Sequence, residues 1–339
     1  MNDMKKTILA VAVTLAATSV NAAEIYNKDG VKLDLGGAAE VQYKKERAEN
    51  SVSKFRLDDG DLFATTTVDV NDSLKGIGKA AFKFEKTAVE NDELYVGVQH
   101  SKFGTFTAGR QTTTFDGAGI SEGIEFGLKF FKDEVTTLAV GSGDSVAKYK
   151  GTFGNAWVGA SYAEFEKGVK DSEKFAYDLA GGYKFGDIET ALYLQHVKAD
   201  AVKAGTIAFN KAKGTTIHGQ VKATFDAITV AASYANTKIT ADSVTVGSTT
   251  TKNPDATTLN VAKLSGSYKL TEKTTLAGGY DYADVKDSLK VHNVYANVSH
   301  KLHNNVKVYT EIGHANVKPT GADKLKTEFG YVAGLEVKF

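Results

Sequence analysis

The chain has 339 residues, of which 42% are hydrophobic, 24% are charged and none is cysteine. Its 41 basic and 41 acidic residues balance, so the chain lacks the basic excess that is typical of nucleic-acid-binding proteins. The absence of cysteine excludes disulfides and thiolate chemistry.

The amino terminus has the pattern of a secretory leader. Two lysines precede an apolar run over residues 8–17, and small residues follow up to Ala22. The pattern predicts a signal peptide over residues 1–22 and a mature chain over residues 23–339.

Two methionines, Met1 and Met4, are candidate initiators of translation. Lys5 and Lys6 directly follow Met4, which is the usual arrangement in leaders of this kind. Both starting points give the same mature chain.

The mature chain has the alternating pattern of β-strands. No stretch after the leader reaches the roughly 18 uncharged apolar residues that a membrane-spanning helix requires. Apolar and polar residues alternate instead, as over residues 31–35, 62–70 and 175–185. The two prolines, Pro254 and Pro319, lie in polar segments typical of loops. We therefore predict an all-β fold.

Turn-forming residues divide the predicted strands unevenly. Short turns are predicted at residues 71–73, 102–104, 154–155, 186–187, 226–227, 271–273 and 303–305. Long polar connections are predicted near residues 44–54, 86–92, 110–137, 165–174, 198–213, 237–258, 284–290 and 317–325. Seven short and eight long connections join sixteen strands. An even number of strands, with tight turns at one end and long loops at the other, is typical of outer-membrane barrels.

The two faces of the predicted strands differ in charge. In the final segment, FGYVAGLEVKF, apolar side chains occupy one parity as far as Phe339. Charged residues elsewhere keep to the other parity, as Lys32, Asp34 and Glu40 do. A soluble jelly roll also alternates, but its charged face would meet water and its bulky face a core. An uncharged parity that is apolar or small favours contact with lipid.

Aromatic residues cluster near the predicted strand ends. Such positions suit the aromatic girdles of a membrane barrel, although aromatic residues also favour strands in general. The examples are Tyr43, Phe153, Tyr162, Phe175, Phe185, Phe225 and Tyr268.

Both ends of the mature chain resemble one known family. The segment AEIYNKDG at residues 23–30, followed by VKLDLGG, resembles the mature start of the general diffusion porins of the Gram-negative outer membrane. Phe339 resembles their carboxy-terminal residue. The resemblance implies a sixteen-stranded antiparallel transmembrane β-barrel with short periplasmic turns and long extracellular loops, in which the chain ends meet. It also implies a homotrimer, contact with outer-membrane lipid and lipopolysaccharide, and recognition of Phe339 by the barrel-assembly machinery.

The link over residues 110–137 resembles the third loop of these porins, which folds into the lumen. The family's Pro-Glu-Phe-Gly tip here reads IEFG at residues 124–127, without the proline. The resemblance places Glu125 at the pore constriction, with Asp116 and Glu122 nearby. Carboxylates in a narrow passage favour cations and repel anions. The alternative is that these residues are ordinary solvated loop charges.

The wall that faces this loop in the family carries a basic ladder, which this chain lacks. Aligned by eye, the arginine positions correspond to Asp61, Asp92 and Ser142, and a lysine position corresponds to Ala38. We therefore expect a weak transverse field and a pore that leans toward cations or is less charge-selective than its relatives.

Three basic residues are candidates for the cationic side of the constriction. Arg110 is one of only three arginines and begins the loop-three link. Lys148 and Lys150 follow in the next predicted strand and partly replace the missing ladder.

Motifs for cofactors and metals are weak. The glycine-rich segment at residues 117–123 has no P-loop lysine after it, and residues 58–61 lack the spacing of a calcium loop. His300 and His303 are placed on opposite faces of a strand and turn. We therefore predict neither a cofactor nor a metal site.

Three classes of function fit a barrel of this kind. The first is a passive channel for ions and small hydrophilic solutes. The second is a solute-specific porin with an aromatic track, but Trp157 is the only tryptophan. The third is a barrel enzyme with carboxylates and histidine near its rim, such as Asp58 and His196. No nucleophile and base stand at a recognisable spacing, so the passive channel is favoured over an enzyme.

Overall fold

The computed structural model describes residues 22–128, 139–166, 173–204 and 207–339. The predicted leader lies outside the described residues except for Ala22, and so do residues 129–138 of the loop-three link. Within the described residues, no helix is both long enough and apolar enough to span a membrane.

The described residues form nineteen strands and one short 3-10 helix, η1 (Thr114–Gly117). The first strands are β1 (Ala23–Lys28), β2 (Val31–Lys45), β3 (Lys54–Asn71), β4 (Leu74–Lys83), β5 (Glu90–His100), β6 (Gly104–Thr112) and β7 (Ser142–Phe153). They are followed by β8 (Ala156–Glu166), β9 (Lys174–Phe185), β10 (Ile188–Ala204), β11 (Ile207–Phe225), β12 (Ile228–Thr240), β13 (Ser243–Val246) and β14 (Thr249–Lys252). The last are β15 (Thr257–Lys269), β16 (Thr274–Val285), β17 (Leu289–His303), β18 (Val306–Pro319) and β19 (Gly330–Lys338).

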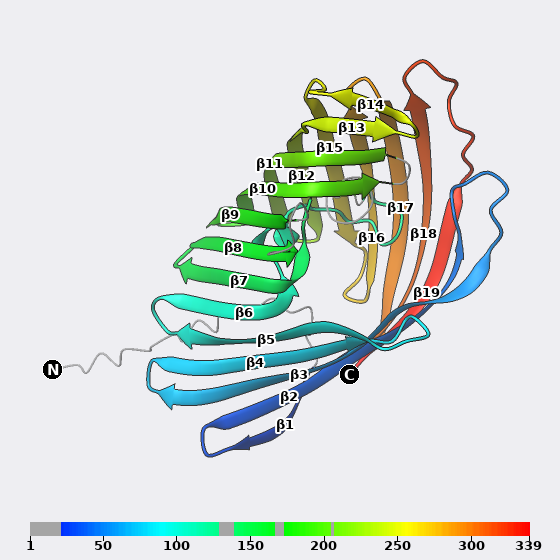
Figure 1. Cartoon of the computed structure of the whole chain (residues 1–339). Coiled ribbons are helices and arrows are strands. Elements are labelled where there is room, and N and C mark those ends of the chain that lie inside the picture. The colour runs from blue at the N-terminus through cyan, green and yellow to red at the C-terminus, as the bar shows by residue number, and fades with distance from the viewer. Residues whose placement is uncertain (1–21, 129–138, 167–172, 205–206) are drawn as a thin grey trace.

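Sixteen of these strands close a ring by antiparallel pairing (Figure 1). Each strand from β2 to β12 pairs with the next, β12 pairs with β15, and the order continues to β19. β19 then pairs with β2 and closes the ring. The hairpin of β13 and β14 extends from β11 beyond the ring, and β1 lies against the first part of β2. The predicted sixteen-stranded antiparallel barrel is confirmed.

The connections divide the barrel into a turn end and a loop end. All seven predicted short turns join consecutive strands at the turn end. An additional turn at Asp29 and Gly30 joins β1 to β2, with both residues at positive φ.

Two predicted long connections are wrong in length. The segment predicted as a loop over residues 198–213 belongs mostly to β10 and β11, which pair from Ile188 to Ala204. Ala199 and Ala212 stand opposite each other there, and both are fully buried. The link predicted over residues 284–290 shrinks to residues 286–288. In both places charged and polar side chains stand on paired strands and resemble loop sequence.

The apolar stripe of the final strand faces outward. In β19, Tyr331 and Leu335 are 39% and 46% exposed, whereas Val332 and Glu336, on the other parity, are buried. Near the turn end the ring exposes aromatic side chains, among them Phe103, Phe153, Phe185, Phe225 and Tyr268. Apolar side chains on the outside and polar side chains inside reverse the pattern of a soluble sandwich.

Ala23, the predicted start of the mature chain, and Phe339 lie along one edge of β2. Phe339 exchanges two backbone hydrogen bonds with Gly37, of 2.7 and 3.0 Å, and Ala23 pairs with Leu35. β19 and β1 therefore occupy consecutive stretches of the same edge, as one composite strand. Cleavage at the predicted site would leave the new amino group beside the terminal carboxylate.

Gly37 leaves no room for a side chain at this seam. A Cβ atom there would lie 2.4 Å from the backbone oxygen of Asp61 and 2.7 Å from the ring of Phe339. We expect Gly37→Ala to lower the free energy of unfolding by about 1–3 kcal/mol, as overpacking does. The measurement is the temperature at which the refolded barrel unfolds. Electrophoresis shows this as the loss of the faster-migrating band of the compact, folded form. Gly76→Ala is the control, because its Cβ would meet no atom closer than 3.9 Å, and equal heat resistance of the two variants would contradict the prediction.

Candidate functional site in the pore

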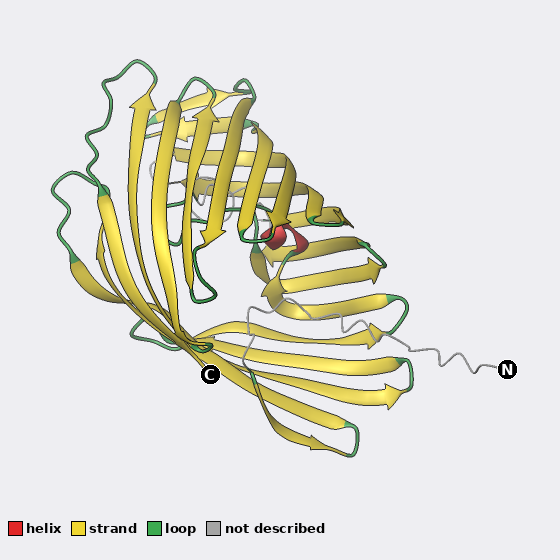
Figure 2. Cartoon of the chain, turned by 180° about the vertical axis from the view of Figure 1, so that it is seen from behind, coloured by secondary structure: helices red, strands yellow, loops and turns green. Residues whose placement is uncertain are grey.

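The link between β6 and β7 enters the ring and follows its inner wall. Figure 2 shows η1 inside the ring of strands. The backbone N–H of Thr114 donates to Ser161 Oγ on β8 over 2.7 Å, and that of Phe115 donates to Asp178 Oδ2 on β9 over 3.1 Å. The start of this link, which we call loop three (residues 113–141), is therefore fixed to the β8–β9 wall.

The tip of loop three is held by one buried carboxylate. Glu311 on β18, 1% exposed, accepts the backbone N–H groups of Ile124, Glu125 and Phe126, and the first and third of these bonds measure 3.0 Å. Asn293 on β17 donates to the carbonyl oxygen of Phe126 over 2.7 Å. Hydrogen bonds to a carboxylate are among the stronger ones in proteins, so the tip is fixed to the β17–β18 wall.

The ring of Phe126 fills a space that two glycines leave free. Phe126 is 1% exposed. A Cβ atom on Gly313 of β18 would lie 2.4 Å from its side chain, and one on Gly330 of β19 would lie 2.6 Å from its ring. The absence of side chains at both positions lets the loop tip approach the wall.

Glu125, the predicted acidic residue of the constriction, lies in an ion-paired network. Its Oε2 atom accepts from Lys44 Nζ over 2.9 Å and from Arg56 Nη2 over 2.8 Å, while Gln42 donates to Oε1 over 3.2 Å. These three partners lie on β2 and β3. Burial alone would raise the pKa of Glu125, but the ion pair with Lys44 and the bond from Gln42 lower it from 4.5 to about 2. Two cations thus balance its charge and join the loop tip to the β2–β3 wall.

The lowered pKa of Glu125 gives a prediction about acid. A carboxyl group whose pKa falls on folding contributes stability above its ordinary pKa and loses it as the pH falls toward the lowered value. The shift from 4.5 to about 2 corresponds to roughly 3 kcal/mol. We expect open-channel current noise to rise as the pH falls below about 4.5, as the tip loosens. Glu125→Gln should remove this acid-dependent rise, and identical titrations of the two proteins would exclude Glu125 as its source.

The wall of β3, β4 and β5 carries the predicted acidic residues of the opposite side. Asp92 pairs with Lys83 over 2.8 Å. Carboxylate oxygens of Asp61, Asp59 and Glu85 all lie within 4.8 Å of one another. A second trio within the same limit consists of Glu40, Asp59 and Glu336. Carboxylates this close together create a strongly negative local potential.

The predicted basic residues stand on β6 and β7. Arg110 Nε pairs with Asp144 over 2.6 Å. Lys148 donates to the backbone oxygen and the hydroxyl of Thr112, over 3.0 and 3.1 Å. Lys150 is half-buried on the same face of its strand. Arg110 and Lys148 therefore bond to local partners near the base of loop three.

The two remaining acidic residues lie on loop three itself. Asp116 is in η1 and is half-buried. Glu122 is held through its carbonyl oxygen, which accepts from Asn297 Nδ2 over 2.7 Å. The roles of Asp116 and Glu122 in selectivity stay predictions.

The sequence reasoning missed the residues that anchor the loop. Glu311, Asn293, Asp178 and Ser161 are polar residues on the inward parity of their strands. Their parity shows that they face the lumen. Nothing in the local sequence shows which of the inward polar residues contact loop three, because the contacts join segments far apart in the chain.

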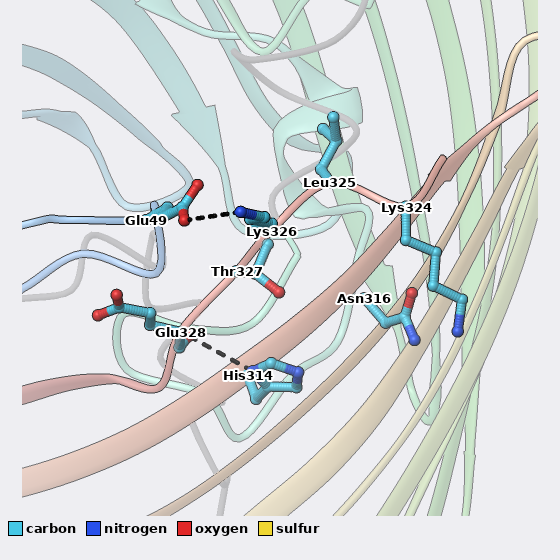
Figure 3. Close-up of a pocket in the computed structure, with 8 residues that line it drawn as sticks. All are labelled: Glu49, His314, Asn316, Lys324, Leu325, Lys326, Thr327 and Glu328. Carbon is cyan, nitrogen blue, oxygen red and sulfur yellow. Dashed lines mark hydrogen bonds and ion pairs between the residues drawn. The ribbon is translucent and has the colours of Figure 1, made fainter. Parts of the chain in front are cut away.

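A polar cavity of about 460 Å³ lies at the loop end, away from the lumen wall (Figure 3). It is lined by Glu49, His314, Asn316, Lys324, Leu325, Lys326, Thr327 and Glu328. Lys326 pairs with Glu49 over 3.5 Å. His314 shares the parity of Ile312, which is 53% exposed on the outer face of β18. The cavity therefore lies on the outer face of the barrel.

Comparison with known proteins decides the family. The family model described as Gram-negative porin matches residues 9–320. The chain belongs to the Gram-negative porin family. It is 38% identical to Porin-like protein H of Photobacterium profundum, with 99% of this chain and 100% of that protein covered. The porin is therefore a diffusion channel of the outer membrane, with its turn end in the periplasm and its loop end outside.

Two further matches support the family and the fold. The porin is 31% identical to the Major outer membrane protein of Pasteurella multocida, over 55% of this chain and 57% of that protein. Its fold matches the trimer form of OmpT from Vibrio cholerae with a TM-score of 0.75 and 21% identity, over 92% of this chain and 100% of the other.

Proposed function

We propose that this porin passes ions and small hydrophilic solutes by diffusion and prefers cations. The passage runs between loop three and the inner wall of β2–β5. The main support is the crowding of carboxylates on that wall, where Asp59 belongs to two trios within 4.8 Å.

The balance of charge around this passage favours cations. The basic residues that contact the loop tip or pair with its neighbouring carboxylates are Lys44, Arg47, Arg56, Lys79 and Lys83. The acidic residues of the wall and the loop tip are Glu40, Asp58, Asp59, Asp61, Glu85, Asp92, Glu93 and Glu125. Several acidic residues therefore exceed the available cations, and a narrow polar passage with this excess attracts cations and repels anions.

The test is the reversal potential of the refolded porin in a planar bilayer that separates dilute from concentrated KCl. We expect the sign that K⁺ permeation produces, and a sign that indicates Cl⁻ permeation would overturn the proposed preference. Liposome swelling with sugars of graded size addresses the alternative of a solute-specific porin. A passive channel gives rates that fall with size alone, whereas saturation and preference at equal size would favour the alternative.

We also propose that the porin forms homotrimers. The support is the resemblance to trimeric porins, including the trimer form of OmpT from Vibrio cholerae. Three equal steps of conductance in single insertions would agree with a trimer, and single steps throughout would contradict it. On the same grounds we propose cleavage of the leader after Ala22 and recognition of Phe339 by the assembly machinery.

The cavity of Figure 3 is a candidate contact for lipopolysaccharide. It lies on the outer face at the extracellular end and presents Lys324 and Asn316, while Lys326 already pairs with Glu49. An ammonium group beside an amide suits the phosphate of a lipid headgroup. We expect Lys324→Gln to reduce co-purification of lipopolysaccharide, with Lys213→Gln, on the outer face of β11, as the control. Equal amounts bound to both variants would exclude the cavity.

A further inference from the structure

One arginine from an outer loop reaches the tip of loop three. Arg47 lies in the first outer loop (residues 46–53), which joins β2 to β3. Its Nη1 atom donates to the carbonyl oxygen of Phe126 over 3.1 Å and also to the side-chain oxygen of Asn293. Asn293 donates to the same carbonyl oxygen over 2.7 Å. The tip is therefore held at its carbonyl oxygen by an outer loop, in addition to the N–H groups that Glu311 accepts.

The side chain of Arg47 also packs against the ring of Phe126. The guanidinium carbon lies 5.3 Å from the ring centroid, which is within the range of a cation–π contact. Gly330 on β19 provides the space, because a Cβ atom there would lie 2.9 Å from Arg47 Cγ and 2.6 Å from the Phe126 ring. Arg47 therefore makes a polar contact and a ring contact with one residue of the tip, and both depend on where its backbone lies.

The backbone of Arg47 is positioned by the last outer loop (residues 320–329), which joins β18 to β19. The carbonyl oxygen of Arg47 accepts the backbone N–H of Glu328 over 2.9 Å. The next residue, Ala48, forms an antiparallel bridge with Thr327. The two loops are therefore paired through their backbones directly beside the residue that contacts the tip.

Side chains join the same two loops, which we call the outer loop pair. The carboxylate of Glu328 pairs with Lys45 and accepts the backbone N–H of Asn50 over 3.3 Å. Lys326 pairs with Glu49 over 3.5 Å (Figure 3). Both loops lie at the loop end of the barrel, which faces the outside of the cell. Separation of the pair would therefore displace Arg47.

We propose that Arg47 is a positioning residue that couples the outer loop pair to the constriction. While the pair is closed, Arg47 holds the carbonyl oxygen of Phe126 near the β17–β18 wall. When the pair separates, the guanidinium is withdrawn and the tip moves more freely in the lumen. The inference rests on the proposed function, because the tip can change the ionic current only in an open pore. An event at the outer loops thus alters the passage without contact with the constriction.

The first test removes the guanidinium. A hydrogen bond from a charged group contributes enough free energy to change an equilibrium roughly tenfold or more. We therefore expect Arg47→Ala to raise the population of the detached tip, and with it the variance of the open-channel current, about tenfold. Arg47→Lys keeps the charge but lacks the planar fork of donors, so it should give an intermediate variance. A variance in Arg47→Ala equal to that of the wild type would overturn the inference.

The second test closes the outer loop pair covalently. The chain contains no cysteine, so Ala48→Cys combined with Thr327→Cys introduces the only two thiols. Residues that face each other across an antiparallel bridge lie about 4.5–5.5 Å apart between their Cα atoms, which suits a disulfide. Glu328→Ala should loosen the pair and raise the current variance. In that variant the disulfide should restore the wild-type variance, and a reductant on the extracellular side should raise it again.

Two controls show whether Arg47 transmits the effect. When Glu328→Ala also carries Arg47→Ala, the same disulfide should leave the variance unchanged. A disulfide from Thr245→Cys and Thr250→Cys should also leave it unchanged, because these hydroxyl groups lie 2.9 Å apart in the β13–β14 hairpin, which forms no hydrogen bond with loop three among the described residues. An equal effect of the outer-loop disulfide with and without Arg47, or its failure to form, would overturn this inference. A protein that conducts no ions would instead overturn the proposed function.

Discussion

Replacing Glu311 by alanine should detach the tip of loop three and produce a wider and noisier channel. The carboxylate of Glu311 is buried and accepts three backbone N–H groups, from residues 124–126. Without it these donors face the β18 wall with no acceptor, at a cost of about 1–3 kcal/mol each. The free energy of the tip would be lower if it turned toward the lumen, because water there can accept these N–H groups. We expect larger conductance, more open-channel noise and faster swelling with sugars near the size limit.

The controls separate loop release from damage to the barrel. Glu336→Ala removes another buried inward carboxylate, which pairs with Lys307 and Lys338 and forms no hydrogen bond with loop three among the described residues. Glu311→Gln retains one oxygen acceptor and should give an intermediate phenotype. If Glu311→Ala and Glu336→Ala raise the open-channel noise equally, the effect belongs to the barrel as a whole and the prediction fails.

Neutralising the acidic wall should abolish the preference for cations. Asp59 and Asp61 lie with Glu85 within 4.8 Å, and Asp59 also belongs to the trio with Glu40. Asp59→Asn combined with Asp61→Asn keeps the shape of both side chains and removes two ionisable groups. Lys83 then remains with fewer anions nearby, so the potential of the passage should move toward zero or become positive. We expect the reversal potential in a KCl gradient to fall to near zero or change sign.

A surface variant provides the comparison for this change. Asp242→Asn combined with Asp323→Asn removes two charges from exposed loops and should leave the reversal potential within error of the wild-type value. If the wall variant keeps the full wild-type reversal potential at low salt, the cation preference does not arise from Asp59 and Asp61, and the prediction fails.

The sequence predicted the strands well because their pattern is local. Alternation in the segment around β19 requires only neighbouring residues, and its outcome is visible in Leu335 outside and Glu336 inside. The same reasoning failed at residues 198–213, where polar side chains stand on paired strands and resemble a loop. Composition alone cannot show whether a polar residue is paired through its backbone.

The candidate site was less predictable because its contacts are long-range. Glu125 was placed at the constriction, but its partners Lys44 and Arg56 are 81 and 69 residues away in the chain. Glu311, which binds the same tip, is 186 residues from Glu125. Register and closure of the whole ring bring these groups together. The family resemblance therefore predicted the acidic loop but not the cations that balance it.

The attachment of the loop-three tip to β18 also bears on how the protein matures. The N-terminal half of the polypeptide supplies the loop, whereas Glu311 belongs to one of the last segments to leave the ribosome. A partly assembled cylinder without its late strands would have nothing to dock the tip against. The pore can therefore reach its final diameter only when the ring of strands has closed. Barrel closure and the setting of the permeability limit thus occur in the same step.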